Sequence, residues 1–149
     1  VYNYLGYMWL ENDMNLDEAG ELIKTAADLQ PESGAIADSL GWFYFKKGKF
    51  EEARDELLRA ESLIEEMDAV ILDHIGQAYH QLGEKETAIE YLERAVELEP
   101  EKEEFTNRLK EYQGGTAKRL PATTSDSAVP NEAKPANGIE ASPQTVRPE

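Results

Sequence analysis

Small residues and large apolar residues recur along the chain at a regular interval. Leucine or isoleucine followed by glycine recurs at intervals of 35 residues, at Leu5-Gly6, Leu40-Gly41 and Ile75-Gly76. An aromatic residue stands three positions after each glycine, and two alanines seven positions apart follow later in each interval. These positions are Trp9, Tyr44 and Tyr79 for the aromatic residues, and Ala19, Ala26, Ala53, Ala60, Ala88 and Ala95 for the alanines. A fixed period of this length indicates stacked repeats, each one a small supersecondary unit.

The apolar spacing within each interval predicts two helices joined by a turn. Glycine and alanine lack bulk, so they let the two helices approach closely while larger residues fill the remaining space. Gly48 and Gly83 are expected to end first helices in the left-handed conformation. Pro31 and Pro100 are expected to follow second helices, since proline cannot continue a helix. We expect first helices at about 1–12, 34–47 and 69–82, and second helices at about 16–29, 50–65 and 85–98.

One further amphipathic segment follows Pro100. Phe105, Leu109 and Tyr112 share one face of a helix at about 101–113, and charged residues occupy the other face. Such a helix caps the open end of a repeat stack. The predicted fold class is therefore all-α, an α-solenoid with a C-terminal capping helix. Its three helix–turn–helix units span about 1–33, 34–68 and 69–100.

Residues 114–149 differ in composition from the rest of the chain. They hold five of the seven prolines and no Phe, Trp or Tyr. This segment has too little apolar surface to offset its conformational entropy, so we expect it to be a disordered tail.

Net charge narrows the choice of partner. The formal charge is −16, and because residues 114–149 hold equal numbers of acidic and basic side chains, all of it lies on the helical part. A body this acidic repels phosphate groups, which argues against nucleic-acid partners. The longest apolar run, 40–45, is far shorter than the roughly 20 residues needed to cross a bilayer, so no membrane insertion is expected. The absence of cysteine fits the cytoplasm and the periplasm alike.

The candidate chemistry argues against catalysis. His74 and His80, the only histidines, are six residues apart and lie about 240° apart around a helix, where they cannot share a metal ion. We expect both to be solvated or to line a groove. Neighbouring acidic residues such as Glu51 and Glu52 point away from each other and cannot act together as acid and base. We predict no catalytic, metal-binding or cofactor-binding residues, so the protein is not expected to be an enzyme.

The pattern Leu-Gly-x-x-Tyr, followed by Ala, Ala and Pro, resembles the tetratricopeptide repeat. The resemblance covers residues 1–100, and 101–113 is similar to the terminal helix of the family. The chain departs from the family pattern in the first turn, where Asp13 replaces glycine, and at Gly20, which should cost a helix about 0.5–1 kcal/mol relative to alanine. Three segments resemble bacterial members: 3–7, 15–19 and 38–42.

In this family the first helices of successive units line a concave groove in which a protein or peptide partner lies. The resemblance implies that these inward positions contact a partner: Asn3, Tyr7, Leu10, Glu11, Asp38, Trp42, Phe45, Lys46, Val70, Asp73, Gln77, His80 and Gln81. Tyr7, Trp42 and Phe45 are aromatic residues that the core of the repeat does not require, and exposed aromatics are typical anchors for a partner. Alternatively, Trp42 and Phe45 pack against a neighbouring helix or against repeats upstream.

Asp38 and Asp73 occupy matching places one unit apart. Members of the family that bind chaperones carry Lys and Asn in such places and clamp a terminal carboxylate. Acidic residues there argue against a carboxylate ligand and favour a partner with apolar side chains and some basic groups. The alternative is that the two aspartates cap or solvate a helix.

The predicted function is a protein–protein interaction scaffold. A second interpretation is that these units are the terminal repeats of a longer solenoid, acting as an accessory or assembly domain of a larger protein, an enzyme among the candidates. Val1 already lies inside the first expected helix, which favours this interpretation. Self-association through the N-terminal edge is a third.

Overall fold

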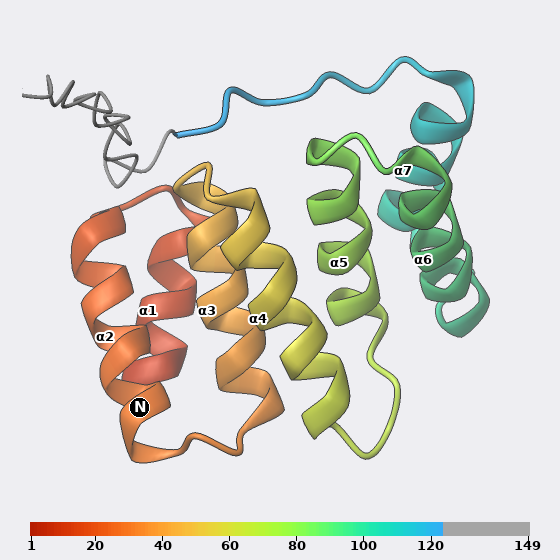
Figure 1. Cartoon of the computed structure of the whole chain (residues 1–149). Coiled ribbons are helices and arrows are strands. Elements are labelled where there is room, and N and C mark those ends of the chain that lie inside the picture. Colours follow the sequence, from red (N-terminus) through yellow and green to blue (C-terminus); the bar gives the residue numbers. More distant parts are fainter. Residues whose placement is uncertain (124–149) are drawn as a thin grey trace, which may run out of the picture.

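The computed structural model describes residues 1–123, which form seven α-helices joined by turns (Figure 1). The helices are α1 (Tyr2–Glu11), α2 (Leu16–Leu29), α3 (Gly34–Lys46), α4 (Phe50–Leu63), α5 (Ala69–Gln81), α6 (Lys85–Leu98) and α7 (Glu103–Gly114). The all-α solenoid predicted from the sequence is confirmed. The helix bounds differ by at most two residues from those expected, for example at α4, which ends at Leu63 rather than 65.

The helices form three antiparallel pairs that stack in chain order. Within the pairs, α1 packs on α2, α3 on α4 and α5 on α6, and α7 closes the stack against α6. The first helices also contact one another, α1 with α3 and α3 with α5, whereas successive second helices of the described residues make no comparable contact. The layer of first helices is therefore the more tightly curved inner layer, and α2, α4 and α6 form the outer layer (Figure 1).

The small residues of the repeat lie where paired helices approach most closely. A Cβ atom at Gly41 would lie 2.6 Å from Cγ of Leu57, and one at Gly6 would lie 2.7 Å from Cγ1 of Ile23. Neither position accepts a side chain without displacing its neighbour. The recurring alanines are buried, five of them completely: Ala19, Ala53, Ala60, Ala88 and Ala95.

Residues with a positive φ angle end the first helices. Gly48 and Gly83 have φ angles of +73° and +82°, as expected for turns after α3 and α5. Asp13, which replaces glycine in the first turn, has φ +51°. Asp68 caps the start of α5, because its Oδ1 accepts hydrogen bonds from the backbone N–H groups of Val70 (2.8 Å) and Ile71 (3.3 Å).

Gly20 has a packing role that the sequence did not reveal. The ring of Phe43 on α3 lies over this glycine, and a Cβ atom there would come within 2.4 Å of the ring. The glycine inside α2 thus makes room for a buried aromatic residue of the next unit. The propensity cost expected for Gly20 is offset by this contact.

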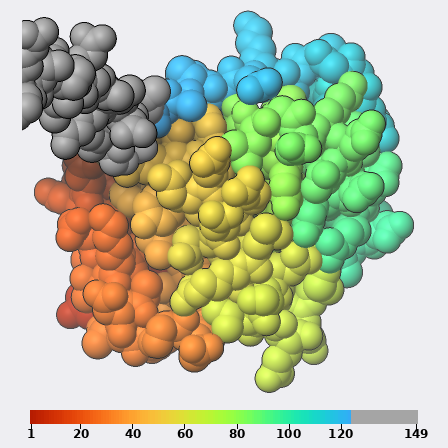
Figure 2. Space-filling view, in the orientation of Figure 1, coloured from red at the N-terminus to blue at the C-terminus, as the bar shows by residue number. Residues whose placement is uncertain are grey.

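Residues 115–123, which we call the strap, differ from the expectation of disorder beyond 114. The strap leaves α7, crosses the end of α5 and reaches the turn between α3 and α4 (Figure 1); it lies directly against these elements in the space-filling view (Figure 2). The backbone N–H of Leu120 donates to Oε1 of Gln81, and that of Thr123 donates to the carbonyl of Gly48 at 3.1 Å. The remainder of the expected tail, 124–149, lies outside the described residues.

Within residues 1–123, no helix is long and apolar enough to span a lipid bilayer.

Candidate functional site

The middle of the inner layer is filled by the protein's own aromatic side chains. Trp42 is sandwiched between Phe45, at 4.5 Å between ring centroids, and the imidazole of His74, at 4.0 Å. Its indole Nε1 donates to Oε1 of Glu11 at 3.0 Å. Both Trp42 and Phe45 are buried, and Phe45 also packs edge-on against Phe50. These residues are therefore not exposed anchors, and the structure has them packed against a neighbouring helix, as the alternative interpretation stated.

His74 is buried rather than solvated, and it pairs with a carboxylate. Its Nδ1 lies 2.8 Å from Oδ1 of Asp38, and both side chains are close to fully buried. Burial favours the neutral imidazole, but the charge of Asp38, the hydrogen bond with it and the charges of Asp73 and Glu11 outweigh this effect and hold the pKa of His74 above its ordinary value. The expectation that this histidine is solvated or lines a groove is corrected.

The Asp73 carboxylate likewise binds side chains of the protein itself. Arg108 of α7 donates to its Oδ1 at 2.5 Å, and Nε2 of Gln77 donates to its Oδ2 at 3.0 Å. Burial raises the pKa of the Asp73 carboxyl although the Arg108 guanidinium opposes this shift. Arg108 also contacts Glu104 at 3.3 Å. Neither aspartate caps a helix: Asp38 of α3 pairs with His74 of α5, and Asp73 of α5 pairs with Arg108 of α7.

The other expected groove residues fall into two groups. Leu10 is completely buried in the core, and Gln81 is held by the strap. Lys46 and His80 are partly exposed but have internal neighbours: Lys46 pairs with Asp13 at 3.0 Å, and His80 stacks on Tyr112 at 4.0 Å. Sequence periodicity placed all four on one stripe, but it gave no sign of the partners that cover them.

The inner layer is open at the N-terminal ends of its helices. A hollow of about 370 Å³ lies there between α1, α3 and α5, and we call it the inner hollow. Four expected groove residues line it: Asn3, Tyr7, Asp38 and Val70. The other lining residues are Tyr4, Ala35, Ser39, Ile64, Asp68 and Ile71.

Sequence reasoning missed most of this lining. Ile64 and Asp68 belong to the connection between α4 and α5, outside the first helices on which the repeat pattern places groove residues. One signal pointed to this loop: the second unit lacks a closing proline, so the chain reaches α5 by a longer path.

The lining of the inner hollow combines rings, apolar side chains and acidic groups. Burial raises the pKa of the Tyr7 phenol, and the nearby carboxylates of Glu11 and Asp38 raise it further, because they disfavour a second negative charge. The side-chain oxygen of Asn3 is buried and has no hydrogen-bond partner within residues 1–123. Asp68 is exposed, and its carboxylate lies at the rim of the inner hollow.

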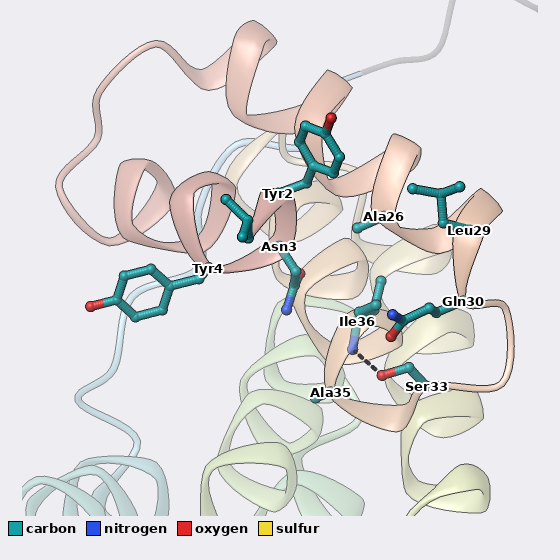
Figure 3. A pocket seen from close by; sticks show the side chains of 10 residues that line it. Tyr2, Asn3, Tyr4, Ala26, Leu29, Gln30, Ser33, Ala35 and Ile36 are labelled. Atoms are coloured by element: carbon teal, nitrogen blue, oxygen red, sulfur yellow. Dashed lines mark hydrogen bonds between the residues drawn. The ribbon is translucent and has the colours of Figure 1, made fainter.

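A second hollow of about 330 Å³, the end hollow, adjoins the first (Figure 3). It lies between α1, the end of α2 and the start of α3, and it shares Asn3, Tyr4 and Ala35 with the inner hollow. In Figure 3 the Asn3 side chain projects from α1 toward α3, whereas the Tyr4 ring projects outward. Asn3 and Ala35 thus stand on the boundary between the two hollows.

No grouping of three or more acidic or histidine side chains suited to hold a metal ion occurs in the described part of the chain.

Comparison with known proteins finds tetratricopeptide repeats in this chain. The family model described as tetratricopeptide repeat matches residues 38–66 and 69–102. A TPR repeat-containing protein of Pseudomonas aeruginosa is 41% identical over 51 residues, which are 34% of this chain and 9% of that protein. The chain thus spans a small part of that relative's length.

Three solved structures have a similar fold. The first TPR of Spaghetti (RPAP3), bound to the HSP90 peptide SRMEEVD, has a TM-score of 0.68 and 25% identity, over 78% of this chain and 91% of that chain. The first TPR domain of human RPAP3 has a TM-score of 0.69 and 25% identity, over 76% and 88% of the two chains. The APC/C hetero-tetramer Cut9-Hcn1 has a TM-score of 0.71 at 19% identity, over 78% of this chain and 24% of that chain, and shows similarity of fold alone.

Proposed function

The chain belongs to the tetratricopeptide repeat family, and on this premise we propose that it binds a segment of a partner polypeptide at the open end of its inner layer. Domains of this family generally mediate protein–protein interaction. The activity that we propose is therefore binding. One observation carries the proposal: the inner hollow is the part of the inner layer that the chain's own side chains leave open, while stacked rings fill the middle.

The partner is a polypeptide with apolar side chains and some basic groups. Val70, Ile71 and Ile64 offer apolar surface in the hollow, which suits aliphatic side chains. The RPAP3 domain of similar fold binds a peptide rich in acidic residues. A peptide of that kind is disfavoured here, because the helical part of this chain carries the whole formal charge of −16.

Two substitutions that introduce the same side chain separate binding at the inner hollow from binding elsewhere. Ala35→Gln adds a long neutral side chain at the boundary of both hollows, at an exposed position of α3. Thr25→Gln makes a comparable change at an exposed position of α2 and serves as the control. Peptides selected from a random display library against the full chain are then titrated against all three proteins.

We expect the selected peptides to bind Ala35→Gln at least tenfold more weakly than the wild type, a loss of about 1.4 kcal/mol, and to bind Thr25→Gln with unchanged affinity. Equal affinity for all three proteins would place binding elsewhere and overturn the proposal. Trp42→Ala and Phe45→Ala are unsuitable for this purpose, because truncating a buried aromatic residue costs about 3–5 kcal/mol of stability.

A second candidate function, as part of a longer solenoid in an accessory or assembly domain, is favoured by one surface. Tyr4, Leu5 and Met8 of α1 are 72%, 39% and 42% exposed, and their spacing places them on one face of the helix. A further helix packed there would bury this face. If the natural protein continues before Val1 with such a helix, the backbone amides of α1 should exchange with solvent more slowly in the longer protein than in this chain. Equal exchange rates in the two proteins would exclude such packing.

A further inference from the structure

We infer that the inner hollow receives the side chain of one lysine or arginine of the partner. This inference rests on the proposed function, which it deepens by naming the group that the hollow recognises. It depends on three properties of the lining: its apolar and aromatic surface, its hydrogen-bond acceptors and its charge.

The first property is a surface that suits a long aliphatic stem. Val70 and Ile71 come from the first turn of α5, and Ile64 follows the last residue of α4. Tyr4 and Tyr7 lie one helical turn apart on α1 and border the same space. Lysine and arginine carry three or four methylene groups that pack on such surface, and aromatic faces attract their charged ends.

The second property is a set of hydrogen-bond acceptors, none of which pairs with a lysine or arginine within residues 1–123. Asp68 caps α5 with its Oδ1, and a carboxylate accepts several further hydrogen bonds. The Asn3 side-chain oxygen lacks a partner within residues 1–123, so an N–H donor that enters the hollow supplies one. Asp38 adds a carboxylate that already contacts His74.

The third property is the sign of the local charge. Asp38 and Asp68 are acidic, and none of the ten lining residues, all of them described, is basic. Glu65 and Glu66 precede Asp68 in the same connection and add two negative charges near the rim. A carboxylate side chain would be repelled here, and a purely apolar one would leave Asn3 unsatisfied. A cationic side chain with a long stem satisfies all three properties.

Small probes test the hollow separately from the polypeptide. The full chain, labelled with ¹⁵N, is titrated with n-butylguanidinium, n-pentanol or pentanoate, which share an alkyl chain and differ in charge. We expect saturable amide shifts at Tyr4, Val70 and Ile71 with n-butylguanidinium at the lowest concentration of the three. Equal or tighter binding of n-pentanol or pentanoate, or no saturable shift with n-butylguanidinium up to 50 mM, would overturn the inference.

One substitution isolates the charge of the rim. Asp68→Asn removes a negative charge but keeps a side chain that caps helices well, so α5 should stay intact. Asp28→Asn makes the same change in charge at an exposed position of α2 and is the control. We expect Asp68→Asn to weaken n-butylguanidinium binding about threefold to fivefold, as for a partly exposed ion pair, and to leave n-pentanol binding unchanged. Equal effects of the two substitutions would contradict a role for Asp68.

The selected peptides complete the test. In a peptide that binds at the inner hollow, each lysine or arginine is replaced in turn by norleucine, and we expect one replacement to lower affinity at least fivefold in the wild type but less in Asp68→Asn. If peptides bind at the hollow with no such sensitivity, the inference fails while the proposed function stands. If no peptide distinguishes Ala35→Gln from the wild type, the proposed function fails independently of the small probes.

Discussion

The imidazole of His74 lies nearly parallel to the indole of Trp42, with ring centroids 4.0 Å apart, and joins α5 to α3 at the centre of the inner layer. The same imidazole contacts Asp38 on α3 through Nδ1. Two interactions of different kinds, one through the ring face and one through the ring edge, thus connect the second unit with the third. The charge state of His74 therefore affects the junction between units as well as its own surroundings.

The first prediction concerns pH. The pKa of His74 is raised in the folded protein, so the stabilisation from its charged form is fully present below its ordinary pKa of 6.5 and is lost as pH rises through the folded value. The free energy of unfolding, measured with urea, should therefore fall as the pH rises above 6.5. His74→Gln removes the titrating group but retains the general repulsion among acidic residues. Its stability should depend less on pH in this range, and parallel curves for the two proteins would contradict the assignment.

The second prediction concerns the capping helix. Arg108→Met leaves the Asp73 carboxylate, whose side chain is 4% exposed, without its cation. Loss of one partner of a buried pair should lower the free energy of unfolding by about 3 kcal/mol, and amides of α7 should exchange faster. Adding Asp73→Asn should restore part of the loss because it removes the unpaired charge. Arg54→Met, which breaks the more exposed pair with Asp55, should cost less, about 0.5 kcal/mol.

The third prediction concerns Gly20. Replacement of glycine by alanine inside a helix normally gains about 1 kcal/mol, but here the added Cβ atom would lie 2.4 Å from the Phe43 ring. Gly20→Ala should therefore lower stability by about 1–3 kcal/mol, as overpacking does. The combination with Phe43→Leu should recover part of this loss. A higher Tm for Gly20→Ala alone would show that the ring moves without cost.

The fourth prediction concerns the strap. Gln81→Met retains the shape of the side chain but removes the acceptor for the Leu120 N–H. A hydrogen bond contributes about 1 kcal/mol, so the Leu120 amide should exchange about fivefold faster, while the melting temperature changes little. Gln30→Met at the exposed end of α2 is the control. Unchanged exchange at Leu120 in Gln81→Met would mean that other contacts hold the strap.

The fold was predictable from the sequence because its main determinants are local. The glycines and alanines that recur every 35 residues occupy the close contacts between paired helices, as at Gly41 and Leu57. The turns followed from Gly48 and Gly83 in the same way. Each of these features depends on one residue type at one position within a unit, so periodicity alone reveals it.

The inner layer was less predictable because its contacts join different units. Trp42 and Phe45 have the spacing of exposed anchors, but His74 of the next first helix covers Trp42, and Phe45 packs on Trp42 and Phe50. A signal did exist: Asp38 and His74 are 36 residues apart and Asp73 and Arg108 are 35 apart, close to one period. Complementary groups at this separation face each other on adjacent first helices. The strap gave no such signal, because it is held largely by backbone atoms of the turns.

The contact between Gly20 and Phe43 also bears on whether the units are interchangeable. At the next junction, Arg54 of α4 corresponds to Gly20, and Ala78 of α5 corresponds to Phe43. The large residue is therefore on the second helix of one unit, and the small residue is on the first helix of the next unit. An engineered chain that placed the second unit after a copy of itself would bring Phe43 opposite Arg54, with no room for both. The volumes of these side chains thus determine which units can follow one another. A chain with shuffled or duplicated units needs a new choice of these two residues at every new boundary.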